Sequence, residues 1–157
     1  GGKWMPGFYS MTCHQAFGGQ TAALPSGRLA GRPLADGLAP VDGTDSLGPT
    51  ASLNSVAKLD QERFGNGINL NIKFAADTVA GEAGRLVLEA LLKGYFSQGG
   101  MQVQINVLDP NVLQEAMDDP DKHRNLLVRI SGYCAYFVDL TPEMQREIVS
   151  RSCQHAR

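Results

Sequence analysis

Two neighbouring residues near the N-terminus, Cys13 and His14, are the first pair that suggests nucleophilic chemistry. An imidazole beside a thiol can favour the reactive thiolate. Adjacent side chains on a strand point to opposite faces, however, so a direct hydrogen bond between this thiol and this ring would be awkward. We therefore interpret Cys13 as a packed or partly buried cysteine and not as a nucleophile.

Metal-binding and nucleotide-binding spacings do not occur in the sequence. The histidines follow no metal-site spacing, and they are His14, His123 and His155. The cysteines form no CxxC pair, which argues against a disulfide framework and a structural zinc site, and they are Cys13, Cys134 and Cys153. The acidic residues of 118–121 lack the spacing of an EF-hand, and the glycine-rich segments match neither a P-loop nor a dinucleotide fingerprint. We therefore expect no bound metal and no bound nucleotide.

Ser131 and Gly132 lie between two apolar stretches within residues 125–139. These residues by themselves favour a tight turn that joins two short strands. From local chemistry alone, a structural turn glycine is the preferred interpretation of Gly132.

The chain that must position these candidate residues divides into two parts of different composition. Residues 1–49 contain ten of the 18 glycines and five of the eight prolines, so they cannot be mostly regular helix or strand. Apolar residues from Trp4 to Leu38 are interleaved there, so the segment is not disordered by composition. A long ordered coil needs a larger body to pack against. Together with the absence of an initiator methionine, this predicts a fragment or a processed chain.

The second part, from residue 49 onwards, has the periodicity of alternating helices and strands. Strand-like alternation and helical spacing with capping residues follow one another in an order typical of an α/β fold. Helices are expected at 49–59, 81–97, 110–117 and from 142, with Asp109 and Thr141 as N-caps. Strands or extended segments are expected at 68–74, 101–107, 126–130 and 136–138.

One face of the two longer predicted strands carries amide side chains instead of charged ones. These residues are Asn69, Asn71, Gln102, Gln104 and Asn106. A solvent-facing strand usually carries lysine and glutamate, so amides indicate a polar surface turned towards other protein or a cavity. An ordinary solvated face is the alternative.

Composition excludes several functional classes. The formal net charge of −2 gives no electrostatic reason to bind nucleic acid or an anionic membrane. No apolar run approaches the length of a membrane-spanning helix, and the first residues have no signal-peptide core. Sparse cysteines fit a reducing environment, so we expect a cytoplasmic protein.

Residues 129–133, Arg-Ile-Ser-Gly-Tyr, resemble the short signature of glycyl radical enzymes, in which Arg, an aliphatic residue, a small residue, Gly and an aromatic residue follow one another. The similarity extends over nearly the whole chain in the right order. The other segments that resemble the family are the loop 24–37, the helix 48–60, the strand 99–108 and the helix and turn 113–124.

The resemblance implies the C-terminal portion of a ten-stranded α/β barrel, in which two loops meet at the centre. One loop carries a catalytic cysteine, and the other, a buried loop, carries the radical glycine, here Gly132. The residues that would support this loop are Arg129, Ile130, Ser131, Tyr133 and Cys134. Residues 1–98 then form a C-terminal barrel segment, and residues 99–157 form the glycine radical domain.

The resemblance also implies partners and a setting. An activating enzyme that uses S-adenosylmethionine and an iron–sulfur cluster would remove one Cα hydrogen of Gly132, so the chain itself needs no bound cofactor. Other implied partners are the remaining N-terminal part of the barrel, a small organic substrate and a second copy in a homodimer. The implied activity is that of an oxygen-sensitive lyase or dehydratase of anaerobic metabolism, similar to pyruvate formate-lyase.

Glycine suits this role because a Cα radical prefers a planar centre that is delocalised into the flanking peptide groups. Glycine has no Cβ to crowd that planar form and tolerates unusual backbone angles. Burial would keep oxygen and water away. The residues expected to provide it are Leu126, Leu127, Val128, Ile130, Tyr136, Phe137 and Val138.

The sequence departs from the family in one respect, because no Cys-x-Glu motif of the catalytic loop is present. Cys134 lies two positions after Gly132, which is the wrong loop for that role. We therefore expect the chain alone to be inactive. A stand-alone accessory subunit that replaces a damaged radical domain is the alternative function, and a binding module with a chance β-turn is a third.

Overall fold

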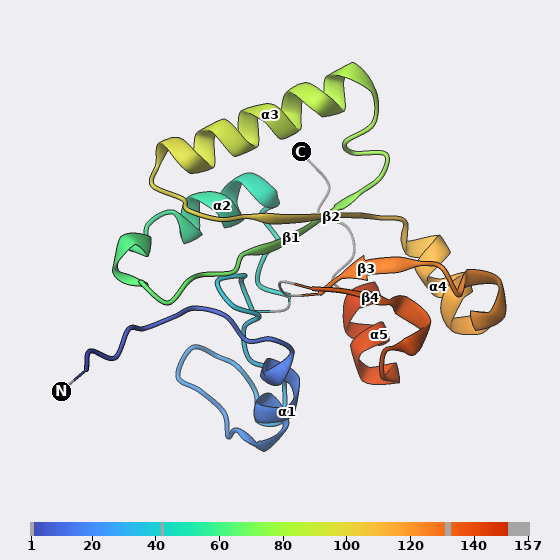
Figure 1. Cartoon of the computed structure of the whole chain (residues 1–157), viewed down its shortest axis with the longest axis horizontal. Coiled ribbons are helices and arrows are strands. Elements are labelled where there is room, and N and C mark those ends of the chain that lie inside the picture. Colours follow the sequence, from blue (N-terminus) through green and yellow to red (C-terminus); the bar gives the residue numbers. More distant parts are fainter. Residues whose placement is uncertain (1, 42, 131–132, 151–157) are drawn as a thin grey trace.

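The computed structural model describes residues 2–41, 43–130 and 133–150 (Figure 1). Helices and short strands alternate along the second half of the chain, as expected of an α/β protein. The α-helices are α1 (Cys13–Gln20), α2 (Pro49–Val56), α3 (Gly81–Ser97), α4 (Pro110–Asp118) and α5 (Pro142–Ser150). The strands are β1 (Asn71–Ala75), β2 (Gln104–Leu108), β3 (Leu127–Arg129) and β4 (Cys134–Tyr136), and 3-10 helices η1, η2 and η3 span Gln61–Arg63, Pro120–His123 and Phe137–Asp139.

Strands β1 and β2 form a parallel pair, in register from Asn71 opposite Gln104 to Ala75 opposite Leu108. Parallel neighbours need a crossover connection, and α3 provides it. Figure 1 shows α2 and α3 on one side of this pair and the β3–β4 hairpin on the other. The strand pair therefore lies between a helical layer and the segment that leads to Gly132.

Two separate hydrophobic cores lie on these two sides. The N-terminal core packs β1 against α2 and α3, and its buried members are Leu38, Leu53, Val56, Leu70, Ile72, Phe74 and Tyr95. The C-terminal core joins α4, β3, η3 and α5, and its buried members are Leu113, Ala116, Val128, Ile130, Phe137 and Ile148. We use "C-terminal body" for the described residues from 110 onwards.

Local signals placed several elements well. The α3 helix spans the predicted residues 81–97. The Asp109 carboxylate accepts a hydrogen bond from the Asn111 backbone N–H at 2.9 Å, as expected of an N-cap. The Thr141 hydroxyl likewise accepts from the Met144 N–H at 3.4 Å.

The expected extended segment at 136–138 is wrong. The strand β4 ends at Tyr136, and Phe137–Asp139 forms the 3-10 helix η3. The last bond across the hairpin runs from the Phe137 N–H to the Leu126 carbonyl at 2.8 Å, after which the Leu140 N–H turns back to the Phe137 carbonyl. Phe137 thus faces the core from a turn and not from a strand.

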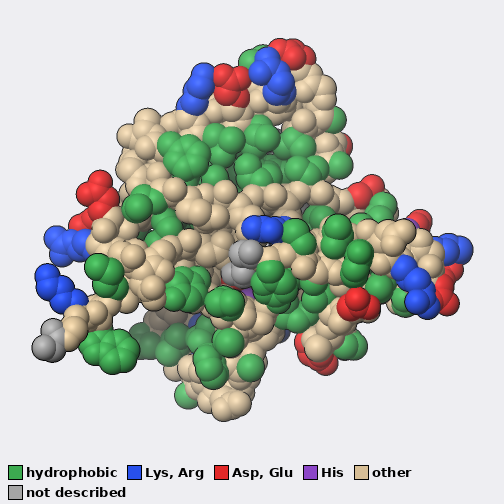
Figure 2. Space-filling model, viewed as in Figure 1, with side chains coloured by type: hydrophobic (Ala, Val, Ile, Leu, Met, Phe, Trp, Pro, Cys, Tyr) green, Lys and Arg blue, Asp and Glu red, His purple; other side chains and the backbone are tan. Residues whose placement is uncertain are grey.

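The N-terminal coil contains a helix, α1, that its glycine content did not predict. Tertiary contact explains Gly18 within it, because an added Cβ would lie 2.5 Å from the Arg32 carbonyl oxygen. Many apolar side chains of the coil are exposed, although Leu38 is buried, and Trp4 is 99% exposed. Figure 2 shows such side chains scattered over the surface, and a hydrophobic band beneath the charged edge of α3. This exposure agrees with the expectation of a larger body beside the chain.

Across the described residues, no helix is both long enough and apolar enough to cross a membrane.

Candidate functional site

The β3–β4 hairpin brings together the residues on either side of positions 131 and 132. Arg129 pairs with Cys134, and the Ile130 N–H donates to the Tyr133 carbonyl at 2.9 Å. The chain therefore reverses direction between Ile130 and Tyr133, as the sequence predicts. Ser131 and Gly132, the centre of the predicted site, lie outside the described residues.

The polar face of the parallel pair holds the backbone that leads into this reversal. The Asn106 carboxamide donates to the Arg129 carbonyl at 3.1 Å and accepts from the Arg129 N–H at 3.2 Å. It therefore makes both peptide hydrogen bonds that a neighbouring strand would make. The Gln104 amide donates to the Ile130 carbonyl at 3.2 Å. The side chains of Gln104 and Asn106 on β2 thus hold the backbone of residues 129 and 130 against the strand pair.

Asn71 completes a ladder of amides on this face, because its Oδ1 accepts from Gln104 Nε2 at 2.7 Å. We call Asn71, Gln104 and Asn106 the amide ladder. Its members lie on both strands of the pair and Asn106 is buried. The prediction that this face is turned towards other protein or a cavity, and not towards solvent, is therefore confirmed for these three residues, which contact the hairpin backbone or one another.

The Arg129 side chain lies along the exposed face of the hairpin. Its Nε donates to Gln104 Oε1 at 3.1 Å, and its Nη1 lies 3.4 Å from the Sγ atom of the exposed Cys134. The Arg129 backbone and side chain are thus both tied to the strand pair. This arrangement supports the hairpin and contains no base that could activate the thiol.

Burial around the hairpin is one-sided. Val128, Ile130 and Phe137 are buried in the C-terminal core, and Phe137 is 0% exposed. Leu127 and Tyr136, which were expected to contribute to burial, are exposed. The two are cross-strand partners on the outer face of the hairpin, which explains the difference. Tyr133 is also exposed.

Cys13 and His14 do not form a catalytic pair. Both ring nitrogens of His14 have other partners, Ser10 Oγ and Glu147 Oε1, each at 2.9 Å. The interpretation of Cys13 as packed is wrong, because its side chain is exposed at the start of α1 while His14 points inward. The sequence did not single out Ser10, Asp36 or Glu147 as partners of this histidine, since contacts across 133 residues leave no local pattern.

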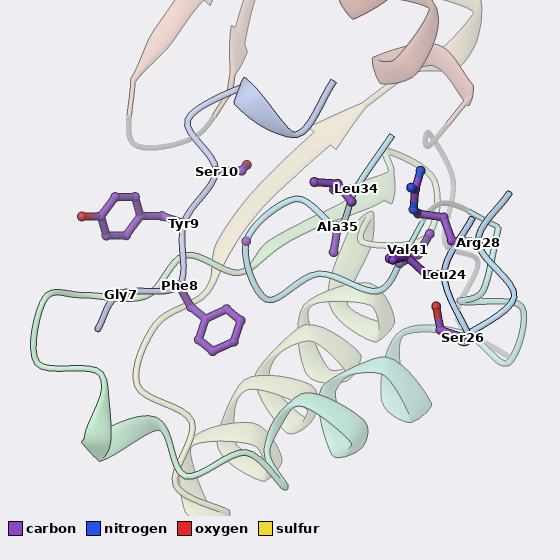
Figure 3. A pocket seen from close by; sticks show the side chains of 11 residues that line it. Gly7, Phe8, Tyr9, Ser10, Leu24, Ser26, Arg28, Leu34, Ala35 and Val41 are labelled. Atoms are coloured by element: carbon purple, nitrogen blue, oxygen red, sulfur yellow. The ribbon is translucent and has the colours of Figure 1, made fainter. Parts of the chain in front are cut away.

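The described part of the chain contains a hollow of about 370 Å³ between residues 7–10 and residues 24–41. In Figure 3, Phe8 and Tyr9 lie on one side of it and Leu24, Ser26 and Arg28 on the other. The Arg28 guanidinium donates to the backbone carbonyls of residues 21, 22 and 32. The described residues that line this hollow include no carboxylate and no imidazole that could act as a general base.

No group of three or more His, Cys, Asp or Glu side chains among the described residues is arranged to hold a metal ion.

Comparison with known proteins decides the family. The sequence model described as "Glycine radical" matches residues 34–138, which include the hairpin and the strand pair beneath it. The chain belongs to the glycine radical family. Trans-4-hydroxy-L-proline dehydratase of Clostridioides difficile is 40% identical over 154 residues, or 98% of this chain. Isethionate sulfite-lyase of Bilophila wadsworthia is 40% identical over 147 residues, or 92% of this chain.

The fold comparison agrees. The B12-independent glycerol dehydratase of Clostridium butyricum, in its glycerol-bound form, superposes with a TM-score of 0.93 and 41% sequence identity over 100% of this chain. This confirms the expected fold, a mixed α/β portion of the glycyl radical enzyme barrel. The chain spans 20% of that structure, 19% of the hydroxyproline dehydratase and 18% of the sulfite-lyase, and it corresponds to their C-terminal part.

Proposed function

We propose that this chain is the radical-storing C-terminal part of a glycyl radical lyase or dehydratase, and that Gly132 carries the radical. The observation that carries the proposal is the match of residues 34–138 to the glycine radical family, within which Gly132 follows Arg129, Ile130 and Ser131 in the family's order. The relatives are dehydratases and lyases by name.

The proposed role of this chain is to hold one unpaired electron on a backbone carbon. An activating enzyme removes a hydrogen atom from the Gly132 Cα. The resulting Cα radical takes a hydrogen atom from a cysteine thiol, which re-forms glycine and leaves a thiyl radical. The thiyl radical takes a hydrogen atom from the substrate and returns it to the product radical at the end of the turnover.

The contacts on the N-terminal side of Gly132 support a storage role. The Asn106 carboxamide holds both peptide groups of Arg129, and Gln104 holds the Ile130 carbonyl. Ile130 is buried against the C-terminal core. A backbone fixed by hydrogen bonds and apolar packing immediately before the radical carbon limits the motions that would expose it to oxygen or stray hydrogen donors.

The catalytic cysteine belongs to a part of the enzyme outside these residues. Cys134 lies on the hairpin itself, and its sulfur faces the Arg129 guanidinium. Cys13 is exposed at the start of α1. Neither is accompanied by a carboxylic acid in the Cys-x-Glu arrangement. The chain alone is therefore proposed to store a radical without turning over substrate.

The remaining elements of the proposal are the activating enzyme with S-adenosylmethionine and an iron–sulfur cluster, a small organic substrate, a homodimer of the complete enzyme and a cytoplasmic, anaerobic setting. Arg129, Ile130, Ser131, Tyr133 and Cys134 are proposed as the supporting residues of the radical loop. The division into a barrel segment, 1–98, and a glycine radical domain, 99–157, also stays a prediction.

The test is anaerobic incubation of the chain with an activating enzyme of a glycyl radical dehydratase, followed by electron paramagnetic resonance. A doublet is expected, since one hydrogen remains on the radical carbon. Gly132→Ala should abolish the signal. Gly94→Ala in α3 is the matched control and should keep it, because an added Cβ there meets no atom within 4 Å.

Two outcomes would count against the proposal. A wild-type chain that stays silent with several activating enzymes, each active on its own partner, would contradict radical storage. A Gly132→Ala chain that still gives the doublet would place the radical elsewhere.

A stand-alone accessory subunit is the competing function, and a second experiment separates the two. The activated chain is mixed with a relative whose own radical domain has been cleaved by oxygen. Restored turnover would favour the accessory role, whereas a chain that carries the radical but restores nothing favours a part of one polypeptide.

A further inference from the structure

A buried ionic cluster outside the hairpin joins three distant parts of the chain. Ser10 Oγ lies 2.9 Å from His14 Nδ1 and donates to Asp36 Oδ1 at 2.6 Å. His14 Nε2 lies 2.9 Å from Glu147 Oε1. We call Ser10, His14, Asp36 and Glu147 the His14 cluster. Its histidine is 4% exposed, so these contacts are shielded from water.

The hydrogen-bond inventory determines the protons on the ring. Ser10 has one hydroxyl hydrogen, and Asp36 receives it, so Ser10 Oγ can only accept from Nδ1 of His14. On the other side of the ring, the Glu147 carboxylate accepts from Nε2. With both carboxyl groups ionised, this pattern places a hydrogen on each ring nitrogen of His14, as in an imidazolium.

The two carboxylates have the donors that ionised groups require. The second oxygen of Asp36 accepts from Asn71 Nδ2 at 2.8 Å. The second oxygen of Glu147 accepts from the side-chain amide of Gln15. Each carboxylate oxygen thus has a donor of its own, and neither carboxyl group needs a proton to satisfy its neighbours.

The cluster lies directly beneath the segment that leads to Gly132. A cavity of about 20 Å³ is lined by His14, Asp36 and Asn71 together with Arg129, Ile130 and α5 residues that include Glu147 and Ile148. Ile148 and Ile130 belong to the same core. Displacement of α5 would therefore move the packing partner of Ile130.

Two residues with cationic side chains, Lys73 on β1 and Arg129 on β3, also line this cavity. The groups bonded to His14 or to its serine partner are thus two carboxylates, and two cationic residues line the adjoining cavity. The attraction between the imidazolium and Glu147 links the N-terminal coil to α5, whereas the two hydrophobic cores lie apart.

We propose that His14 is a positioning residue, whose ring docks α5 through Glu147 and thereby seats Ile130. The docking of α5 by His14 is argued from contacts within this chain alone. Its consequence for the lifetime of the radical rests on the proposed function. His14 touches neither substrate nor the radical carbon, because it acts through Glu147 and α5.

Nuclear magnetic resonance of the chain tests the proton assignment directly. Two ring N–H hydrogens are expected on His14 at neutral pH, with nitrogen shifts of an imidazolium. A neutral His14 with a single ring hydrogen at neutral pH would overturn the proposal.

Variants test the docking. His14→Gln and Glu147→Gln should each lower the protection factors of the α5 and Ile130 amides by roughly tenfold or more, as expected for a lost hydrogen bond to a charged group. The double variant should lose no more than the larger single variant, since both changes break one contact. The β1–β2 amides should keep their protection, which shows that the fold persists.

His123→Gln is the matched control. His123 faces Glu115 at 3.6 Å within the C-terminal body, so its loss does not touch the link to the coil. Equal effects of His14→Gln and His123→Gln would overturn the proposal. If His14→Gln fails to fold, Glu147→Gln and the wild-type ring protons still decide it.

The radical signal provides a separate outcome. In an activated chain, His14→Gln should shorten the lifetime of the doublet. A wild-type chain without any doublet would contradict the proposed function but leave the exchange result intact. A changed exchange pattern with an unchanged radical lifetime would overturn the link between the seating of Ile130 and radical storage.

Discussion

The two hydrophobic cores of this chain differ in what surrounds them. The N-terminal core packs β1 beneath α2 and α3, and apolar side chains such as Leu86, Val87 and Phe96 remain exposed on its helical side. The C-terminal core lies within residues 108–149 and is closed by α4, η3 and α5. Directional polar contacts join the two, through the amide ladder and the His14 cluster.

The difference shows that apolar burial and hydrogen bonds have separate roles in this chain. Apolar burial is non-directional and stabilises each core from within. Hydrogen bonds depend on angle and distance, so they fix how the C-terminal body sits on the strand pair. Interfaces that are more polar than the cores on either side commonly permit relative motion. The geometry near Gly132 therefore depends on a few side chains more than on total buried area.

The largest effects are expected from removing one aromatic side chain from either core. Phe137→Ala and Phe74→Ala should each lower the free energy of unfolding by about 3–5 kcal/mol, because each leaves a cavity at a buried position. Hydrogen exchange should locate the loss. Phe137→Ala should release β3, β4 and α5 first, and Phe74→Ala should release β1 and β2 first. Equal loss of protection throughout both variants would mean that the two cores unfold as one unit.

A smaller effect is expected at the joint between the cores. Asn106→Ala removes both side-chain bonds to Arg129 and should cost about 1–3 kcal/mol. Asn106→Asp should cost a similar amount, because a carboxylate facing the Arg129 carbonyl accepts hydrogen bonds but donates none. Exchange of the Arg129 amide measures the local opening. Asn54→Ala is the control, since Asn54 bonds Gln98 at the exposed end of α3.

The smallest effect is a loss of stability at alkaline pH that is expected in the N-terminal core, which contains Tyr95. Burial raises the pKa of the Tyr95 phenol above its ordinary value of 10.0. The free energy of unfolding that the buried, protonated Tyr95 phenol contributes is therefore fully present below pH 10.0. It is lost as the pH rises further, because this tyrosine ionises more readily in the unfolded chain. Urea unfolding should show the N-terminal core weakening first.

Tyr95→Phe isolates this group. The variant should cost about 1 kcal/mol at neutral pH, because the hydroxyl hydrogen is shared between Gln61 Oε1 at 3.1 Å and the Gln102 carbonyl at 3.2 Å. It should also flatten the alkaline dependence. An unchanged alkaline slope would show that another group titrates there.

The sequence predicted those features that depend on neighbours along the chain. The α3 bounds follow from helical spacing and the Gly99 stop, and the Asp109 cap follows from the residue type beside Pro110. The amide face was predicted because alternation places residues 71, 104 and 106 on one side of their strands. The family signature located Gly132 without any geometry.

Features that depend on distant partners were missed. The α1 helix forms because Gly18 lets the helix backbone approach residues 32–34, which its own glycine content does not reveal. The His14 cluster assembles residues that are as many as 133 positions apart. The exposure of Leu127 and Tyr136 depends on which face of the hairpin meets the C-terminal core. Local pattern does not determine these choices.

The amide ladder has a chemical consequence beyond its geometry. A carboxamide neither gains nor loses a proton over the range in which proteins work, so the potential that Asn71, Gln104 and Asn106 impose on the neighbouring peptide groups does not vary with pH. Thiols and phenols can surrender a hydrogen atom to a radical far more readily than an amide can. On the side of the strand pair, the side chains that bond to the backbone of residues 129 and 130 are therefore inert to both proton and hydrogen-atom transfer.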